Sequence, residues 1–263
     1  MSVLALRNRE LFWSLVRREV RGRYKGSVLG LLWTLVTPLV LMGAYTLVFS
    51  VLFTVFPIED YPAFLLTGLA VWIFFAGGLQ AGTASVVANA NLLKKVAFPR
   101  AVVPLSTLSS HLVTFAVMVA ALVPVNLIVR PETRATMILL PVLLVALILM
   151  TAGAALALSA VNVYFRDVEH VLAAILLPWF FLTPIFYSFD SLPGRVTSRE
   201  WAVDVLRYGN PVTPYVESIQ DVAFFGIWPS AALLAYVAVV TAVLVVVGIV
   251  VFRRLEREMA VEL

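Results

Sequence analysis

The chain has 263 residues, of which 62% are hydrophobic and only 13% carry a charge. Soluble domains usually have about 25% charged residues, so this composition excludes an ordinary soluble protein and favours one membrane-embedded domain over residues 1–263. A net charge of +4 would suit nucleic acid, but the cations lie beside apolar stretches, where they orient a chain in the membrane. The absence of cysteine excludes disulfides and cysteine-based metal sites.

Residues 8–24 are predicted to form an amphipathic helix within a cytoplasmic segment, residues 1–27. Apolar side chains recur every four positions from Phe12 to Tyr24, and arginines occupy the positions between them. A basic amphipathic helix of this kind is expected to lie flat at the membrane surface. A simple juxtamembrane anchor explains the same pattern, so the function of this helix stays open at this point.

Six stretches are long and apolar enough to cross a bilayer, which takes about 20 residues of helix. Spans one to five lie within residues 28–187, and the last span lies within residues 227–252. The six predicted spans cover, in chain order, residues 28–56, 63–88, 101–129, 135–163, 171–187 and 228–252. The fifth is the weakest because Pro178 and Pro184 interrupt it. The predicted fold is an all-α integral membrane protein with six transmembrane helices.

Residues 188–226 form the longest segment outside the predicted spans. Its charged residues are interspersed with aromatic residues such as Trp201, Tyr208 and Tyr215. Aromatic side chains mixed with charge favour short helices that lie at, or dip into, the membrane interface. We therefore expect short re-entrant or interfacial helices before the last span, and a short tail over residues 253–263.

The connections between the spans differ in positive charge. The 19 Lys and Arg residues divide 14 to 5 between the two sets of alternate connections. The positive-inside rule places the richer set, which includes both termini and residues 89–100 and 164–170, in the cytoplasm. Both termini on one side require an even number of spans, and six satisfies this.

The sequence carries no signature of an enzyme or of an ion-driven carrier. It contains no G-x-x-x-x-G-K-[ST] phosphate loop and no H-E-x-x-H metal motif. No carboxylate lies in the middle of a predicted span. The histidine of the third span, His111, suits a proton path, but a hydrogen-bonded packing residue is the favoured interpretation. The chain therefore either conducts passively or takes its energy from another subunit.

Two short cytoplasmic segments are suited to contact such a subunit. Residues 89–100, NANLLKKVAFPR, predict a short helix with apolar residues packed inward and basic residues in water. Pro99 ends it, because the residue before a proline disfavours helical backbone. A plain amphipathic turn fits the spacing equally well. In YFRDVEH, residues 164–170, Asp167 is expected at the start of the next helix, where negative charge is favourable.

Five strings, in this order, resemble the permease subunit of ABC-2 type exporters of polysaccharides and polyol phosphates, which serve O-antigen, capsule, teichoic acid and galactan. They are RREVRGRYKGSVLGLLWTLVTPL (17–39), NLLKKVAFPRAVVPLSTL (91–108), NVYFRDVEHVL (162–172), PWFFLTPIFYS (178–188) and GNPVTPYVESIQD (209–221). Together they extend over nearly the whole chain. The Arg-Asp-Leu usual in the first motif is replaced here by Arg18-Glu19-Val20.

The resemblance implies the membrane subunit of an ATP-driven exporter that moves a lipid-linked polysaccharide or polyol-phosphate polymer out of the cytoplasm. It implies a homodimer in a bacterial inner membrane, with both termini cytoplasmic. Two copies of a cytoplasmic ABC ATPase would bind the ATP and Mg. This chain is then expected to be no enzyme, to bind no metal or cofactor itself, and to contact its substrate and membrane lipid but no nucleic acid.

The resemblance also assigns roles to residues. The ATPase-coupling helix would comprise Asn91, Leu92, Leu93, Lys94, Lys95, Val96, Phe98, Pro99 and Arg100. The second cytoplasmic contact would comprise Tyr164, Arg166, Asp167 and Glu169. The gate helix, whose cations attract anionic headgroups, would use Arg18, Arg21, Arg23, Tyr24 and Lys25. The candidate aromatic channel walls are Trp72, Phe74, Phe75, Trp179, Phe180, Phe181, Phe186 and Tyr187, although packing is the commoner role of such residues.

Three other functions stay open on the sequence alone. They are an ABC-2 permease for drugs or small lipids, a membrane-embedded glycan-processing enzyme or acyltransferase, and a passive channel. An enzyme requires clustered acid, base or nucleophile groups at one membrane depth, which this sequence does not offer. A passive channel gives no reason for a docking helix between two spans.

Overall fold

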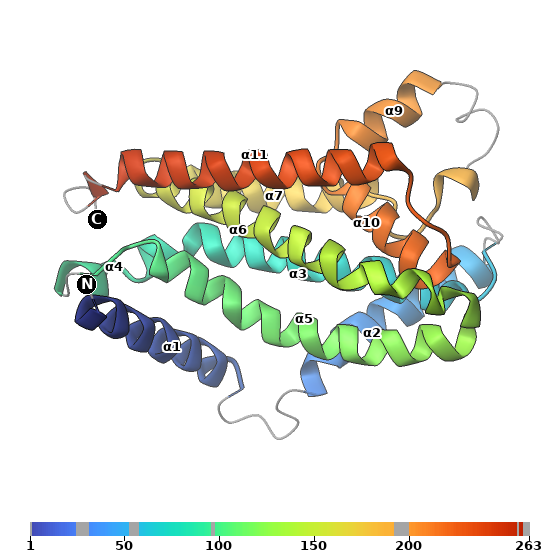
Figure 1. Cartoon of the computed structure of the whole chain (residues 1–263), viewed down its shortest axis with the longest axis horizontal. Coiled ribbons are helices and arrows are strands. Elements are labelled where there is room, and N and C mark those ends of the chain that lie inside the picture. The colour runs from blue at the N-terminus through green and yellow to red at the C-terminus, as the bar shows by residue number, and fades with distance from the viewer. Residues whose placement is uncertain are drawn as a thin grey trace.

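The computed structural model describes residues 2–24, 32–52, 58–95, 98–191, 200–256 and 258–259. Every regular element among these residues is helical (Figure 1), which confirms the predicted all-α class. The elements are α1 (Ser2–Tyr24), α2 (Trp33–Thr46), η2 (Leu47–Leu52), α3 (Tyr61–Ala88), α4 (Ala90–Lys95), α5 (Val102–Val129), η3 (Pro131–Arg134), η4 (Thr136–Leu139), α6 (Leu140–Tyr164), α7 (Asp167–Leu182), η5 (Phe189–Ser191), α9 (Glu200–Tyr208), α10 (Thr213–Gln220), η6 (Asp221–Phe225) and α11 (Ala231–Leu255).

Five helical stretches in the described residues are long and apolar enough to cross a membrane. They are Leu35–Leu52, Tyr61–Ala88, Val102–Val129, Thr136–Tyr164 and Ala231–Leu255. These stretches confirm the second, third, fourth and sixth predicted spans. They confirm the part of the first that is described, while its ends at 28–31 and 53–56 lie outside the described residues. α3 and α5 have 28 residues each, and a helix of that length rises roughly 42 Å, which exceeds the hydrocarbon core of about 30 Å.

The predicted fifth span, residues 171–187, is wrong at both ends. In its place lies α7, which begins at Asp167 and has 16 residues, so that it rises roughly 24 Å and is shorter than the hydrocarbon core. The helix ends because Pro184 forces the preceding residue, Thr183, into extended backbone with φ −96° and ψ 136°. The described residues therefore do not confirm the count of six spans.

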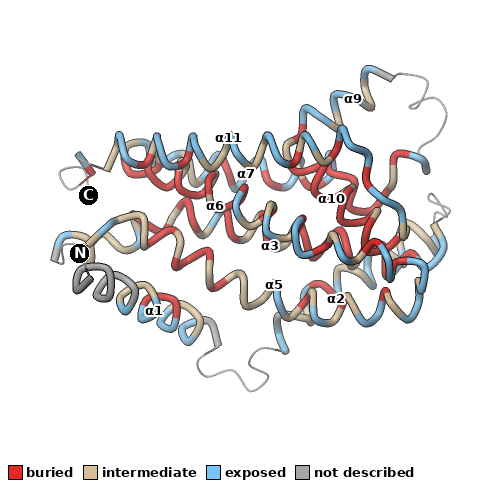
Figure 2. Tube along the Cα trace, in the orientation of Figure 1, coloured by how far each residue is buried: buried red, intermediate tan, exposed pale blue. Residues whose placement is uncertain are grey.

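α3 lies at the centre of the bundle. It packs against α5 and α6 and also contacts α2, α7 and α10. The residues from Thr67 to Trp72 are buried without interruption, so every side of this helix is covered (Figure 2). The outer faces of α5 and α11 expose apolar residues such as Ile128 and Val239, which suits helices whose surroundings are lipid.

α6 and α11 form the most extensive helix pair. Two glycines allow their backbones to meet: a Cβ on Gly153 would overlap the carbonyl oxygen of Leu244, and a Cβ on Gly248 would overlap the carbonyl oxygen of Gly153. Small residues at a crossing are the usual way for membrane helices to approach closely. α6 and α11 therefore pack backbone against backbone at this point.

The segment between α7 and α11 contains the short helices that the sequence predicts. α9 stands away from the bundle, whereas α10 inserts among α3, α6 and α11 (Figure 1). The hydroxyl of Tyr215 on α10 is 3.1 Å from the carbonyl oxygen of Val237, to which it donates, and 2.6 Å from the hydroxyl of Thr241. These two hydrogen bonds join α10 to α11.

The bundle has two ends that differ in content. One end, which we call the α4 end, holds α4 and the first and last described residues of the chain (Figure 1). The opposite end, the α9 end, holds η3, α9 and η6. This arrangement agrees with an even number of passes. α1 packs along α5 and runs obliquely beside the bundle; its position at the membrane interface stays a prediction.

Candidate functional site

The α4 end gathers the segments predicted to contact an ATPase. The predicted helix in residues 89–100 is confirmed as α4, whose outer face exposes Asn91 and Lys94. Leu93 packs inward against a small buried cluster at this end. After α4, Phe98 and Arg100 are half-buried and Pro99 is exposed. Lys95 is the last described residue of α4, and Val96 lies outside the described residues.

The second predicted contact forms the turn from α6 into α7. Asp167 and Glu169 lie in the first turn of α7, which confirms the predicted place of Asp167 at a helix start. The carboxamide oxygen of Asn162 accepts a hydrogen bond from the backbone N–H of Glu169 at 3.1 Å. Arg166 is exposed at the tip of the turn, and the Tyr164 hydroxyl donates to the carbonyl oxygen of Leu255 at 2.8 Å.

Among the described residues, α1 meets the start of α4 through a polar contact of Arg18. Arg18 donates to the side-chain oxygen of Asn89 at 2.5 Å and also pairs with Glu19 at 3.2 Å. Leu15 and Val16 are buried beneath it, as the predicted amphipathic pattern requires. Of the other predicted gate residues, Arg21 is exposed, while Lys25 and the side chains of Arg23 and Tyr24 lie outside the described part of the chain.

The last described residues of the chain complete the α4 end. Glu256 accepts a hydrogen bond from the backbone N–H of Arg100 at 3.1 Å, and the Arg100 guanidinium donates to the carbonyl oxygen of Glu256. Phe252 and Met259 are buried in the same cluster as Val163. The role of Glu256 has no signal in the sequence, because nothing in a charged tail indicates a contact with a residue 156 positions away.

At the α9 end, two arginines organise the polar groups. Arg130 pairs with Asp60 at 3.1 Å, with Glu132 at 3.6 Å and with Glu59 at 3.7 Å. Its guanidinium also lies 5.0 Å from the centre of the Phe224 ring. Asp60 has left-handed backbone (φ 52°), which aspartate tolerates better than most residues. Arg130 therefore ties the turn before α3 to the turn after α5.

Arg207 forms the second group at the α9 end. It donates two hydrogen bonds to the carboxylate of Glu217, at 3.0 and 2.8 Å, and lies 4.7 Å from the centre of the Phe189 ring. Burial raises the pKa of Glu217, although Arg207 acts in the opposite direction. Burial, with the nearby charges of Glu217 and Asp190, raises the pKa of Asp221 to about 7. Arg207 is therefore bonded to Glu217, and its charge also acts on Asp221.

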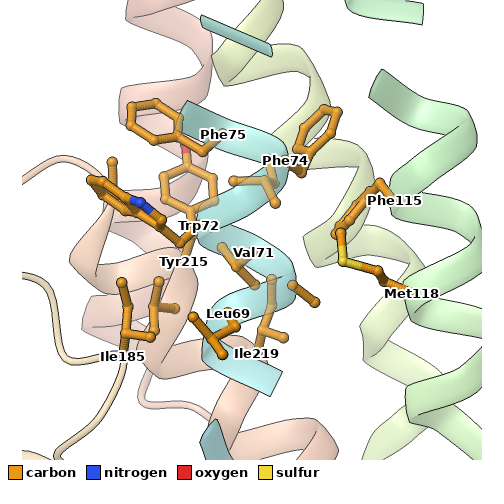
Figure 3. Close-up of a cluster of buried hydrophobic side chains, with 14 of the residues drawn as sticks. Leu69, Val71, Trp72, Phe74, Phe75, Phe115, Met118, Ile185, Tyr215 and Ile219 are labelled. Atoms are coloured by element: carbon orange, nitrogen blue, oxygen red, sulfur yellow. The ribbon is translucent and has the colours of Figure 1, made fainter. Parts of the chain in front are cut away.

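The candidate channel aromatics are mostly buried inside the chain. Six of them are at most 7% exposed: Trp72, Phe74, Phe75, Phe180, Phe186 and Tyr187. Figure 3 shows Trp72 and Phe75 near Tyr215, while Phe74 stacks on Phe115 on the other side of α3, with ring centres 4.5 Å apart.

In this conformation of the single chain, these six side chains pack against other residues of the same chain. Their role as channel walls stays a prediction. Trp179 is half-buried and donates to the side chain of Asn210 at 2.8 Å. Phe181, which is 46% exposed, remains the best placed of the eight.

His111 lies against Gly77, where an added Cβ would be 3.0 Å from two atoms of the imidazole ring. The missing side chain of the glycine therefore makes room for the histidine between α3 and α5. This close contact favours the packing interpretation of His111 over a proton path.

The chain matches known proteins over almost its full length. The model of the family described as ABC-2 type transporter matches residues 10–224. The O-antigen export system permease protein RfbA of Myxococcus xanthus is 31% identical over 252 residues, which are 96% of this chain and 95% of that protein. RfbA of Klebsiella pneumoniae is 28% identical over 255 residues, 95% and 94% of the two chains. The polysialic acid transport protein KpsM of Escherichia coli is 25% identical over 256 residues, 94% and 93%.

The family match extends from α1 to η6 and so includes both segments at the α4 end and the short helices at the α9 end. The resemblance read from the five sequence strings is confirmed by this match. Helices that cross a membrane and a match of this extent agree with each other. The chain belongs to the ABC-2 type transporter family.

Proposed function

We propose that this chain is the membrane subunit of an ATP-driven exporter that carries a lipid-linked polysaccharide out of the cytoplasm. The likeness over more than nine-tenths of the chain to proteins named for O-antigen export and polysialic acid transport carries the proposal. Relatives with two different polymers in their names support a polymer cargo over a drug or a small lipid. Its location is then a bacterial inner membrane, with the α4 end in the cytoplasm.

The energy for export comes, in this proposal, from a separate cytoplasmic ABC ATPase that binds the ATP and Mg. α4 is the docking surface: Asn91, Lys94 and Pro99 face outward, while Leu93 anchors the segment inward. The exposed Arg166 on the neighbouring turn supplies a second contact. The inward packing of Leu93 couples α4 to the rest of the bundle, so that movement of a bound ATPase would be transmitted to the bundle.

The transport path is proposed to lie between two copies of the chain. α7 buries only the stripe formed by Leu172, Leu176 and Phe180 and leaves most of its apolar surface uncovered. Leu177 is 67% exposed and Phe181 is 46% exposed. Packed side chains fill the interior around α3, so one copy offers no space for a polymer there. A second copy facing α7 would enclose a path with an aromatic wall.

α1 is proposed as the gate helix at the entrance to this path. Arg18 and Arg21 are exposed on it, and exposed cations near a membrane attract anionic headgroups. The polar contact of Arg18 with Asn89 connects the gate helix to the start of α4. Docking of the ATPase on α4 would therefore change the position of Arg18, one of the two exposed arginines proposed to attract anionic headgroups.

The test is co-purification of the chain with its co-expressed ABC ATPase, together with the amount of polymer exported in cells. The double variant Asn91→Asp/Lys94→Glu reverses the charge of the docking face, and we expect at least a roughly tenfold weaker association, the size expected for like charges set against each other. Arg134→Glu makes a comparable change at the α9 end, where Arg134 is exposed, and should leave association unchanged. Leu93→Asp is a poor probe because Leu93 packs inside the chain.

Three results would contradict the proposal. The purified chain would hydrolyse ATP alone, or no ATPase would associate with the unaltered chain, or cells lacking the chain would export polymer normally. Light scattering on the purified complex measures its mass and decides whether two copies of each subunit are present.

A further inference from the structure

The start of α5 and the end of α11 are joined by polar contacts at the α4 end. α5 begins after Ala101, which has no side chain that can cap the helix. Glu256 instead brings its carboxylate to this helix start and accepts from the N–H of Arg100 at 3.1 Å. A negative charge is favourable there because the first N–H groups of a helix point outward and carry positive partial charge.

At the end of α11, hydrogen-bond donors meet the backbone carbonyl groups. Its last carbonyl groups have no partners within the helix. The Tyr164 hydroxyl donates to the carbonyl oxygen of Leu255 at 2.8 Å, and the Arg100 guanidinium donates to the carbonyl oxygen of Glu256. A cation near a helix C-terminus is favourable for the same electrostatic reason. Arg100 therefore caps the end of α11, and the carboxylate of Glu256 lies just before the start of α5, where the N–H groups of Val102 and Val103 are bonded to the carbonyl oxygens of Pro99 and Arg100.

Apolar packing reinforces these polar contacts. Phe252 is 2% exposed and Met259 is fully buried, in one cluster with Val86, Ala160 and Val163. Leu93 of α4 packs against the same cluster. The tail, by which we mean the described residues between 252 and 259, is therefore bonded to the start of α5 and to the end of α6, and Leu93 of α4 packs against the cluster that includes Phe252 and Met259.

We propose that this tail is a brace that fixes α4 relative to the turn between α6 and α7, and that Glu256 is its positioning residue. The inference rests on the proposed function in one respect only, the assignment of α4 as the docking surface. Arg18 holds one end of the α4 segment through Asn89, and Glu256 holds the other end through Arg100. In this proposal, Arg18 passes a displacement of Asn89 to α1, and Glu256 passes a displacement of Arg100 to α11.

The first experiment measures geometry and does not depend on the ATPase. The chain has no cysteine, so spin labels can be placed through Asn91→Cys and Arg253→Cys, both at exposed positions. Pulsed electron paramagnetic resonance on the purified chain in lipid nanodiscs then reports the distance between α4 and the end of α11. We expect a narrow distribution in the parent and a clearly broader one after Glu256→Ala.

The second experiment measures coupling in the complex with the ATPase. Glu256→Ala should leave ATP hydrolysis in place and lower the polymer exported per ATP hydrolysed by roughly tenfold, which is the factor that corresponds to one charge-assisted hydrogen bond. Glu256→Gln keeps an acceptor for the Arg100 N–H and should recover part of the loss. Glu258→Ala is the matched control, since Glu258 is exposed two residues further on.

The outcomes are separable. If the distance distribution and the export per ATP after Glu256→Ala equal those after Glu258→Ala, the brace is refuted. Should Glu256→Ala not accumulate in membranes, Glu256→Ser, whose side chain is too short to reach the Arg100 N–H, decides by the same two readouts, and its equality with Glu258→Ala refutes the brace. If no ATPase associates with the unaltered chain, the proposed function fails, and the spin-label distances still decide whether Glu256 fixes α4.

Discussion

Single charged residues determine how the α9 end responds to pH. Arg207 is bonded to Glu217; the charge of Asp190 contributes to the raised pKa of Glu217, and the charges of Glu217 and Asp190 contribute to the raised pKa of Asp221. Because the pKa of Asp221 is raised to about 7 from an ordinary value of 3.8, the folded chain favours the protonated form of this carboxyl. The pKa of Glu217 is shifted in the same direction.

The sign of the pH dependence follows from linkage. A carboxyl with a raised pKa in the folded state contributes stability that is fully present below its unfolded pKa and is lost as the pH rises through its folded pKa. For Asp221 this window runs from about pH 4 to about pH 7. We therefore expect the chain in detergent to have a higher Tm at pH 5.5 than at pH 8.

Asp221→Asn tests this expectation, because the amide has nearly the same shape and no charge. The variant should raise the Tm at pH 8 by about 2 to 4 °C and reduce the difference between the two pH values. A variant at an exposed carboxylate of the same segment, Asp204→Asn, serves as the control. A pH difference as large in Asp221→Asn as in the parent would refute the role of Asp221.

Sequence periodicity gave a correct account of side chains whose partners are close along the chain. The inward positions of Leu15 and Val16 follow from the amphipathic pattern of α1, and the place of Asp167 follows from the preference of helix starts for negative charge. The partners of Glu256 and Arg18 did not follow, because each contact joins residues that are far apart in sequence. Only the tertiary arrangement brings them together.

At the scale of elements, the crossing of α6 and α11 leaves no space for a side chain at Gly153 or Gly248. Gly153 and Gly248 place the two backbones against each other, so that any side chain at either position meets main-chain atoms that cannot rotate away. Overpacking of a rigid site of this kind typically costs about 1 to 3 kcal/mol. By contrast, Gly43 on α2 has nothing within 4 Å of an added Cβ.

The matched pair Gly248→Ala and Gly43→Ala tests the crossing. Gly248→Ala should lower the free energy of unfolding by about 2 kcal/mol, because the added methyl group forces α6 and α11 apart. Gly43→Ala should be neutral or stabilising by up to about 1 kcal/mol, because alanine favours the helix. Titration of both variants with denaturing detergent measures the difference. Equal stability of the two would show that α6 and α11 do not meet at Gly248.

The boundaries of α7 illustrate which element ends are readable in a sequence. Pro184 was recognised as an interruption, and the preference of a pre-proline residue for extended backbone explains why the helix stops at Leu182. The predicted fifth span extends to residue 187 because the apolar residues continue through Phe186, whereas the helix ends at Leu182. The sequence predicts a short helix at the membrane interface in this segment, but the mixed polar and apolar residues of α10, TPYVESIQ, do not indicate that it inserts among α3, α6 and α11.

At the scale of the whole molecule, the two ends of the bundle are predicted to face opposite sides of the membrane. Single cysteines in the cysteine-free chain decide this directly. Asp204→Cys on α9 and Glu258→Cys in the tail are both exposed positions. An impermeant maleimide added to intact spheroplasts should label the cysteine at 204 and reach the one at 258 only after the membrane is opened. The reverse pattern would invert the topology, and labelling of both from outside would contradict a sealed crossing.

One uninterrupted helix joins these two sides. α11 has 25 residues without a proline, and its first turn is closed by Ser230, which accepts from the N–H of Leu233 at 3.2 Å. A helix of this length is roughly 37 Å long, with α10 bonded to it through Tyr215 near one end and the tail at the other. Such a rod transmits tilt over its full length, so a force applied beside Arg100 reaches α10 on the far side of the bilayer without any relay of small side-chain movements.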